Sequence, residues 1–171
     1  EQNAAALAEH FERGGEPARA AQLYGRAAEQ ALEGNDLQAV IELGERAIRC
    51  GAAGELLGRT RMLQAEAHRW RGELAVAAGR ADEAVLLLPE GSAAFYGALT
   101  EAILGHLLVD DRPGFLAHVR RLREPAGTAV GPRAIAVARA AIGLLLTGLR
   151  DEARALLEEL SSWPPGALDS M

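Results

Sequence analysis

At residues 7–27 the chain reads LAEHFERGGEPARAAQLYGRA. Apolar residues recur at helical spacing on both sides of the glycine pair, with Leu7, Ala8 and Phe11 before it and Ala20, Tyr24 and Ala27 after it. Each set lies on one face of a helix. The break at Gly14–Pro17 combines glycine with a proline suited to the first turn of a helix. The stretch therefore predicts two short antiparallel helices that pack closely through alanine.

A turn glycine followed five residues later by alanine recurs along the chain. The pairs are Gly15 and Ala20, Gly34 and Ala39, Gly72 and Ala77, Gly79 and Ala84, and Gly148 and Ala153. The last pair has good support, because an apolar helix is predicted over 134–146 before it and leucines continue at helical spacing over 156–160 after it. Self-similarity of this kind predicts a repeat architecture.

The helices between these two ends are predicted from their caps and breaks. Asp36 and Ser92 are suited to cap the start of a helix, and Pro89 ends one. The helix predicted after Asp36 carries the apolar face Ala39, Leu43 and Ala47. The helices predicted after it span 55–71, 74–88, 92–109 and 110–123. Residues 124–132, with two prolines and two glycines, form a predicted flexible connector. We count about four hairpins, as expected from a repeat of about 34 residues.

The composition favours helix over strand throughout. Hydrophobic residues make up 49% of the chain but aromatic residues only 4%, so the core is built mainly from alanine and leucine. Both are strong helix formers, and the β-branched residues typical of strands are sparse. All 18 basic residues are arginine, which we attribute to the coding bias of a GC-rich bacterial genome. We therefore expect an all-α fold with a single domain over residues 1–171.

Charge and cysteine content exclude several classes of protein. The formal net charge of −6 argues against binding to nucleic acid or to an anionic membrane, because both require a basic field. No apolar run approaches the roughly 20 residues needed to span a bilayer. Cys50 is the only cysteine, so we expect no intrachain disulfide and a cytoplasmic location. Because the chain opens with Glu1 and ends abruptly after Trp163-Pro164-Pro165-Gly166, we expect a piece of a larger protein.

The first hairpin resembles the tetratricopeptide repeat in Leu7, Ala8, Phe11, Gly15, Ala20, Tyr24 and Ala27. It departs from the pattern of that family at Leu32, where the family has proline. The resemblance implies a right-handed superhelical solenoid in which the first helix of each hairpin lines the concave surface. Residues 55–74 are also similar to the helical-repeat regions of large bacterial signalling proteins, which carry a kinase or a nucleotide-binding ATPase module upstream.

The sequence contains none of the common motifs of catalysis. It has no phosphate loop, no glycine-rich dinucleotide turn, no paired cysteine ligands and no His-Glu-x-x-His. We therefore expect no enzymatic activity and no cofactor. Cys50, beside Gly51 at a helix end, fits a small buried hydrophobe better than a nucleophile. The adjacent Glu158 and Glu159 point in different directions and fit solvated charges rather than an acid and base pair.

The histidines allow one arrangement of metal ligands. His106 and Asp110 lie one helical turn apart, a spacing that can present two ligands to one metal ion. Asp111 is adjacent, and His118 could fold back across the turn at Pro113-Gly114. The simpler interpretation is that the two aspartates cap the following helix. We therefore expect no metal site.

The strongest candidate for binding lies on the predicted helix 55–71. Arg61, Gln64, His68 and Arg71 recur at spacings of three and four residues, beside an apolar stripe that ends at Trp70. We call these four residues the basic strip. By resemblance to the repeat family, the strip would face the carboxylates of a bound peptide; the alternative is an ordinary solvated helix face. We expect Trp70 in the core, and Trp163 either against the last helix or against a following repeat.

These observations favour a non-catalytic scaffold that binds a protein or peptide. Its partner is either a separate protein or another domain of the same polypeptide, for which it would serve as the regulatory arm of a bacterial signalling protein. One alternative is a receptor for a small ligand or peptide signal, which requires a deep groove lined by arginine and histidine. A small helical enzyme would require an assembled cleft of titratable groups. Homodimerisation through exposed ends also stays open.

Overall fold

The computed structural model describes residues 4–123 and 129–161. Within these ranges all of the regular structure is helical, as predicted. The nine helices are α1 (Ala4–Arg13), α2 (Pro17–Glu33), α3 (Leu37–Arg49), α4 (Gly54–Trp70), α5 (Leu74–Leu87), α6 (Ala93–Leu108), α7 (Arg112–Arg123), α8 (Val130–Leu146) and α9 (Arg150–Ser161). None of them is long and apolar enough to cross a membrane.

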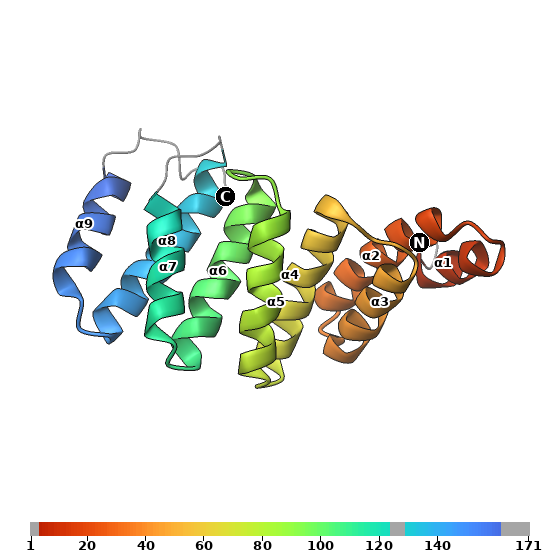
Figure 1. Ribbon diagram of the computed structural model, residues 1–171, viewed down its shortest axis with the longest axis horizontal. Coiled ribbons are helices and arrows are strands. Elements are labelled where there is room, and N and C mark those ends of the chain that lie inside the picture. The colour runs from red at the N-terminus through yellow and green to blue at the C-terminus, as the bar shows by residue number, and fades with distance from the viewer. Residues whose placement is uncertain (1–3, 124–128, 162–171) are drawn as a thin grey trace.

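The helices pack in the order of the chain. Each helix contacts the next as an antiparallel neighbour, and Figure 1 shows the array running from α1 at one end to α9 at the other. Among helices two apart in the chain, the extensive contacts join α2 to α4, α4 to α6 and α6 to α8. The even-numbered helices therefore form a layer of their own, and α4 lies between the N-terminal and C-terminal halves of that layer.

The helix starts predicted at Asp36 and Ser92 and the turn predicted at Gly15 are confirmed. Gly79 was predicted as a turn glycine and this is wrong, because it lies inside α5. The Asp36 side chain accepts a hydrogen bond from the Ala39 amide at 3.1 Å, and the Ser92 hydroxyl accepts one from Phe95 at the same distance. Such caps satisfy backbone amides that have no partner within the helix. Gly15 adopts φ +77°, a left-handed conformation that costs glycine little, and this ends α1 just before Pro17 begins α2.

The core is built mainly from alanine and leucine, with a few large side chains. The largest cluster of buried residues joins α4 through α9, and two smaller clusters join α1 through α4. Tyr24 is fully buried in one of these smaller clusters, and its hydroxyl donates to Glu12 at 2.6 Å. Arg46 stacks on the Tyr24 ring at 4.4 Å and also binds Glu12 at 2.8 Å. Cys50 is buried in the same cluster, as predicted, and burial raises the pKa of its thiol.

The structure differs from the sequence-based expectation at two further points. The prediction that Trp70 lies in the core is wrong, because this side chain is 63% exposed. It is the last residue of α4, and its ring lies 4.9 Å from the Arg69 guanidinium. Helix α8 begins at Val130, inside the predicted connector, while residues 124–128 of that connector and Trp163 lie outside the described residues.

Candidate functional site

A surface cavity lies between α2 and α4. Its volume is about 340 Å³, and every lining residue belongs to one of these two helices. The lining is Gln22, Gly25, Arg26, Glu29, Leu56, Arg59, Thr60 and Leu63. Leu56 and Leu63 supply apolar surface, Arg26 and Arg59 supply positive charge, and Glu29 supplies one carboxylate. The cavity therefore offers both an apolar contact and charged donors to a bound group.

A second cavity lies further along the same layer, between α4, α6 and α8. Its volume is about 230 Å³. The lining is Met62, Glu66, Gly97, Thr100, Glu101, Pro132, Ile135 and Arg139. Only even-numbered helices line the two cavities, and α4 contributes to both. We call the surface that carries them the even-helix face.

The charges of the even-helix face are only partly paired within the chain. Arg59 bonds to Glu55 at 2.8 Å, but this pair lies on one helix and both side chains are about half exposed. Glu101 is tied into a largely buried pair with Arg69 at 2.7 Å. Among the described residues, the side chains of Arg26 and Arg139 have neither a hydrogen bond nor an ion pair. These two guanidinium groups can therefore meet an anionic partner without first breaking an internal contact.

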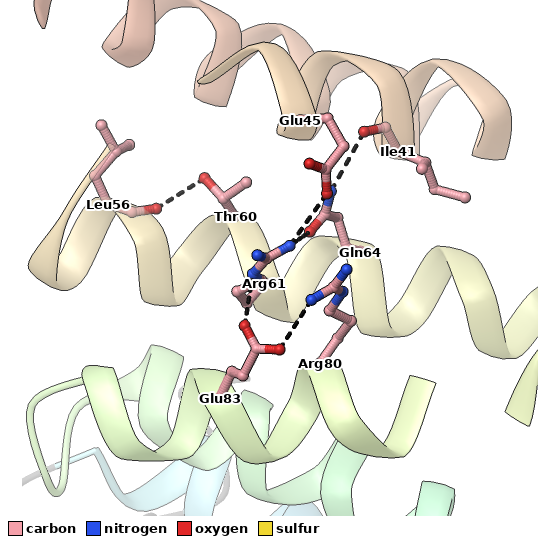
Figure 2. A network of polar contacts seen from close by, with 8 residues as sticks. All are labelled: Ile41, Glu45, Leu56, Thr60, Arg61, Gln64, Arg80 and Glu83. Carbon is pink, nitrogen blue, oxygen red and sulfur yellow. Dashed lines mark hydrogen bonds and ion pairs between the residues drawn. The ribbon is translucent and has the colours of Figure 1, made fainter. Parts of the chain in front are cut away.

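The basic strip lies partly on another side of α4. Figure 2 shows Arg61 and Gln64 of α4 between Glu45 of α3 and Glu83 of α5. Gln64 is fully buried; its amide donates to Glu45 at 3.0 Å and to the Ile41 carbonyl at 3.3 Å. Arg61 donates to the Gln64 side-chain oxygen at 2.8 Å and to Glu45 at 3.1 Å. The amide of Gln64 is thus satisfied inside the molecule, where a solvated strip would have left it exposed.

The network continues from α4 to α5. The Nε atom of Arg61 lies 2.8 Å from Glu83, which also accepts a hydrogen bond from Arg80 at 2.9 Å. Burial alone would raise the pKa of Glu45, but the hydrogen bond from Gln64 and the charge of Arg61 outweigh it and lower that pKa. The positive charge of Arg61 is therefore balanced by carboxylates of the neighbouring helices.

The other two residues of the strip share a carboxylate after the end of α4. His68 bonds through Nδ1 to Glu73, and Arg71 donates to the same carboxylate at 2.9 Å and to the Gln38 side chain. These contacts lower the pKa of Glu73, the bond from His68 most of all. The strip is thus two internally paired groups and not an open row of cations. Its role in partner binding stays a prediction.

Three helices bring a different set of side chains together. His106 lies 2.8 Å from Asp111, and not against Asp110 as its helical spacing suggested. Asp82 of α5 lies 3.0 Å from His106 and 2.7 Å from His118 of α7. Burial would raise the pKa of Asp82, but the contacts with His118 and His106 outweigh it and lower that pKa. Sequence reasoning missed Asp82, because no local spacing connects it to the histidines.

Comparison of the chain with protein-family models, with curated proteins and with solved structures gave no match.

Proposed function

We propose that this chain is an interaction module that holds an extended protein or peptide segment across its even-helix face. The observation that carries the proposal is the pair of cavities lined only by α2, α4, α6 and α8. Two cavities that follow one another along one face suit an elongated partner better than a compact one. The architecture we propose is a right-handed superhelical solenoid of the tetratricopeptide type.

The chemistry of the face indicates the kind of partner. Arg26 and Arg139 are suited to bind carboxylates of the partner, because a guanidinium group binds a carboxylate with paired hydrogen bonds. Leu63 and Ile135 are suited to contact apolar side chains that lie between those carboxylates in the partner. Because packed helices hold these groups before the partner arrives, binding costs little ordering entropy. We propose that the partner is a cytoplasmic protein or another domain of the same bacterial signalling polypeptide.

Selection from a displayed library of random peptides tests the proposal. We expect enriched peptides to combine acidic and apolar residues. Their affinity, measured by fluorescence polarisation, should fall by about tenfold or more for the double variant R26E/R139E, because charge reversal places like charges together. The matched control is R13E, which reverses an exposed arginine of α1 outside the face. Equal affinity for R26E/R139E and R13E would refute the proposed face.

The basic strip is tested in the same assay. The triple variant R61A/H68A/R71A removes its positive side chains while leaving the even-helix face intact. If the strip takes no part in binding, the selected peptides bind this variant as they bind the original chain. A specific loss of affinity, with unchanged helicity by circular dichroism, would move the binding surface to the strip.

A receptor for a small ligand is a second candidate, and one cavity favours it. This cavity has a volume of about 260 Å³ and is lined by His106, Leu107, Asp110, Arg112, Phe115, Leu146 and Thr147. It combines arginine and histidine with apolar surface, as such a receptor requires. A thermal-shift screen of small carboxylates and phosphates, repeated on R112A, distinguishes this candidate, because a genuine ligand stabilises the original chain and not the variant.

A further inference from the structure

The side chains that converge from α5, α6 and α7 have the composition of a metal site. Asp82, His106 and His118 each offer one ligand atom, and these three atoms lie within 4.8 Å of one another. The two imidazole rings are tilted by 33° with centroids 5.2 Å apart, so their Nε2 atoms approach the same carboxylate from neighbouring directions. Two imidazoles and one carboxylate are a ligand set found in zinc sites that keep an open position.

The spacing of these atoms is close to what a metal ion requires. Ligands at about 2.0–2.1 Å from tetrahedral zinc are about 3.3 Å apart. Here the Asp82 oxygen lies 3.0 Å from His106 Nε2 and 2.7 Å from His118 Nε2. Binding would therefore require the Asp82 oxygen to move away from each nitrogen by a few tenths of an ångström. Small rotations of the two rings would adjust the distance between their nitrogens, which lie within 4.8 Å of each other.

Asp111 supplies the support that metal-binding histidines usually have. Its Oδ2 atom lies 2.8 Å from His106 Nδ1, and its Oδ1 atom accepts a hydrogen bond from the Gly114 amide at 3.2 Å. A carboxylate that accepts a hydrogen bond from one ring nitrogen of a histidine keeps the proton on that nitrogen. The lone pair of the other nitrogen is then free to bind the metal. His106 thus faces a carboxylate at each nitrogen, and could donate to both only with a proton on each. A metal ion at Nε2 would take the place of one of those protons.

Burial and access also fit a metal ion. The side chains of His106 and His118 are 11% and 14% exposed, so neighbouring residues hold their rings. Asp82 is 40% exposed, which leaves a path for an ion from solvent. Two of the three ligands are imidazole nitrogens and only one is a carboxylate. This set favours a divalent ion of the zinc type over calcium or magnesium, which prefer a shell made entirely of oxygen.

We propose that Asp82, His106 and His118 bind a divalent transition metal ion such as zinc, with Asp111 orienting His106. The ion ties α5, α6 and α7 together. Three protein ligands leave one position of a tetrahedral site for water or for a group from a partner. The site is separate from the even-helix face, whose cavities none of these residues line.

The test uses the untagged chain after removal of metal with a chelator. We expect isothermal titration with zinc to show one saturable site per chain, and cobalt to give the visible absorption bands of tetrahedral coordination. D82N, H106Q and H118Q should each lose at least about tenfold in zinc affinity, and D111N about tenfold to a hundredfold. Excess magnesium should not displace the zinc.

H10Q and H68Q are the matched controls, because they remove histidines outside the cluster and should leave zinc binding unchanged. Circular dichroism of each metal-free variant establishes that it is folded. If a variant does not fold, the cobalt spectrum of the original chain still decides whether the ligands include nitrogen in a tetrahedral site. Absence of saturable binding, or zinc affinity retained in D82N and H118Q, would overturn the proposal.

Discussion

The packing of α5 against α6 predicts opposite effects for the same substitution at two glycines. Both Gly79 and Gly105 lie inside helices, and both can be replaced by alanine without backbone strain, because neither has a positive φ. A Cβ atom at Gly105 would lie 2.9 Å from the Cα atom and 3.2 Å from the backbone nitrogen of Ala78. A Cβ atom at Gly79 would meet nothing within 4 Å.

The expected magnitude follows from separating two contributions. Replacing glycine by alanine inside a helix stabilises by about 0.5–1 kcal/mol, and this gain is common to both variants. Only Gly105→Ala adds overpacking against a backbone that cannot rotate away, at a cost of about 1–3 kcal/mol. The free energy of unfolding of Gly79→Ala should therefore exceed that of Gly105→Ala by about 1–3 kcal/mol, while Gly79→Ala itself should be more stable than the original chain.

Urea unfolding followed by circular dichroism measures the difference. The two variants should differ in midpoint with little change in slope, since a change in slope would report altered compactness. In thermal unfolding the same difference corresponds to about 2–10 °C for a chain of this size. If Gly105→Ala is as stable as Gly79→Ala, α6 does not approach Ala78 as closely as the structure places it, and the account of this interface is wrong.

Three further outcomes follow from the buried polar groups. Gln64→Ala should cost about 1–3 kcal/mol in urea unfolding, because it removes a fully buried side chain that bonds to Arg61, Glu45 and the Ile41 carbonyl. Gln38→Ala, at an exposed position, should change stability by less than about 0.5 kcal/mol. Tyr24→Phe should cost about 1 kcal/mol through loss of the bond to Glu12, and an unchanged urea midpoint would show that this bond contributes nothing. Because the pKa of Glu45 is lower in the folded chain than in the unfolded one, its contribution to stability is complete above the unfolded value of about 4.3 and is lost as pH falls through the folded value. The urea midpoint should accordingly decrease when the pH is lowered below about 4.5, and it should decrease less in Glu45→Gln. An equal dependence of the midpoint on pH in both chains would contradict the assignment.

The positions of the helices could be predicted because their signals are local. Asp36 and Ser92 each cap a helix by accepting a hydrogen bond from the amide three residues later, so the whole interaction lies within one helical turn. Gly15 and Pro17 together end one helix and begin the next, again within a few residues. Information of this range is present in the sequence itself. The superhelical handedness expected from the repeat resemblance depends on longer-range packing and stays a prediction.

The histidine cluster shows where local information ends. Helical spacing placed Asp110 and Asp111 near His106, and the structure selects Asp111 because Asp110 has the left-handed conformation that terminates α6. Asp82 comes from another helix, 24 residues away from His106 in the chain. Only the packing of α5 on α6 brings it into contact, and the local spacing of residues does not reveal that packing.

The same limit explains why the sequence pointed to one side of α4 for binding, whereas we propose a binding surface on another side of the same helix. Arg59 and Glu66 of α4 lie seven residues apart, and so do Arg61 and His68. Each pair lies along one line of a helix, and the two-residue offset between the pairs places those lines on nearly opposite sides. Both lines carry polar side chains, so hydropathy does not distinguish them. The distinction comes from other helices: Glu45 and Glu83 pair with Arg61, whereas the side that carries Arg59 opens into a cavity shared with α2.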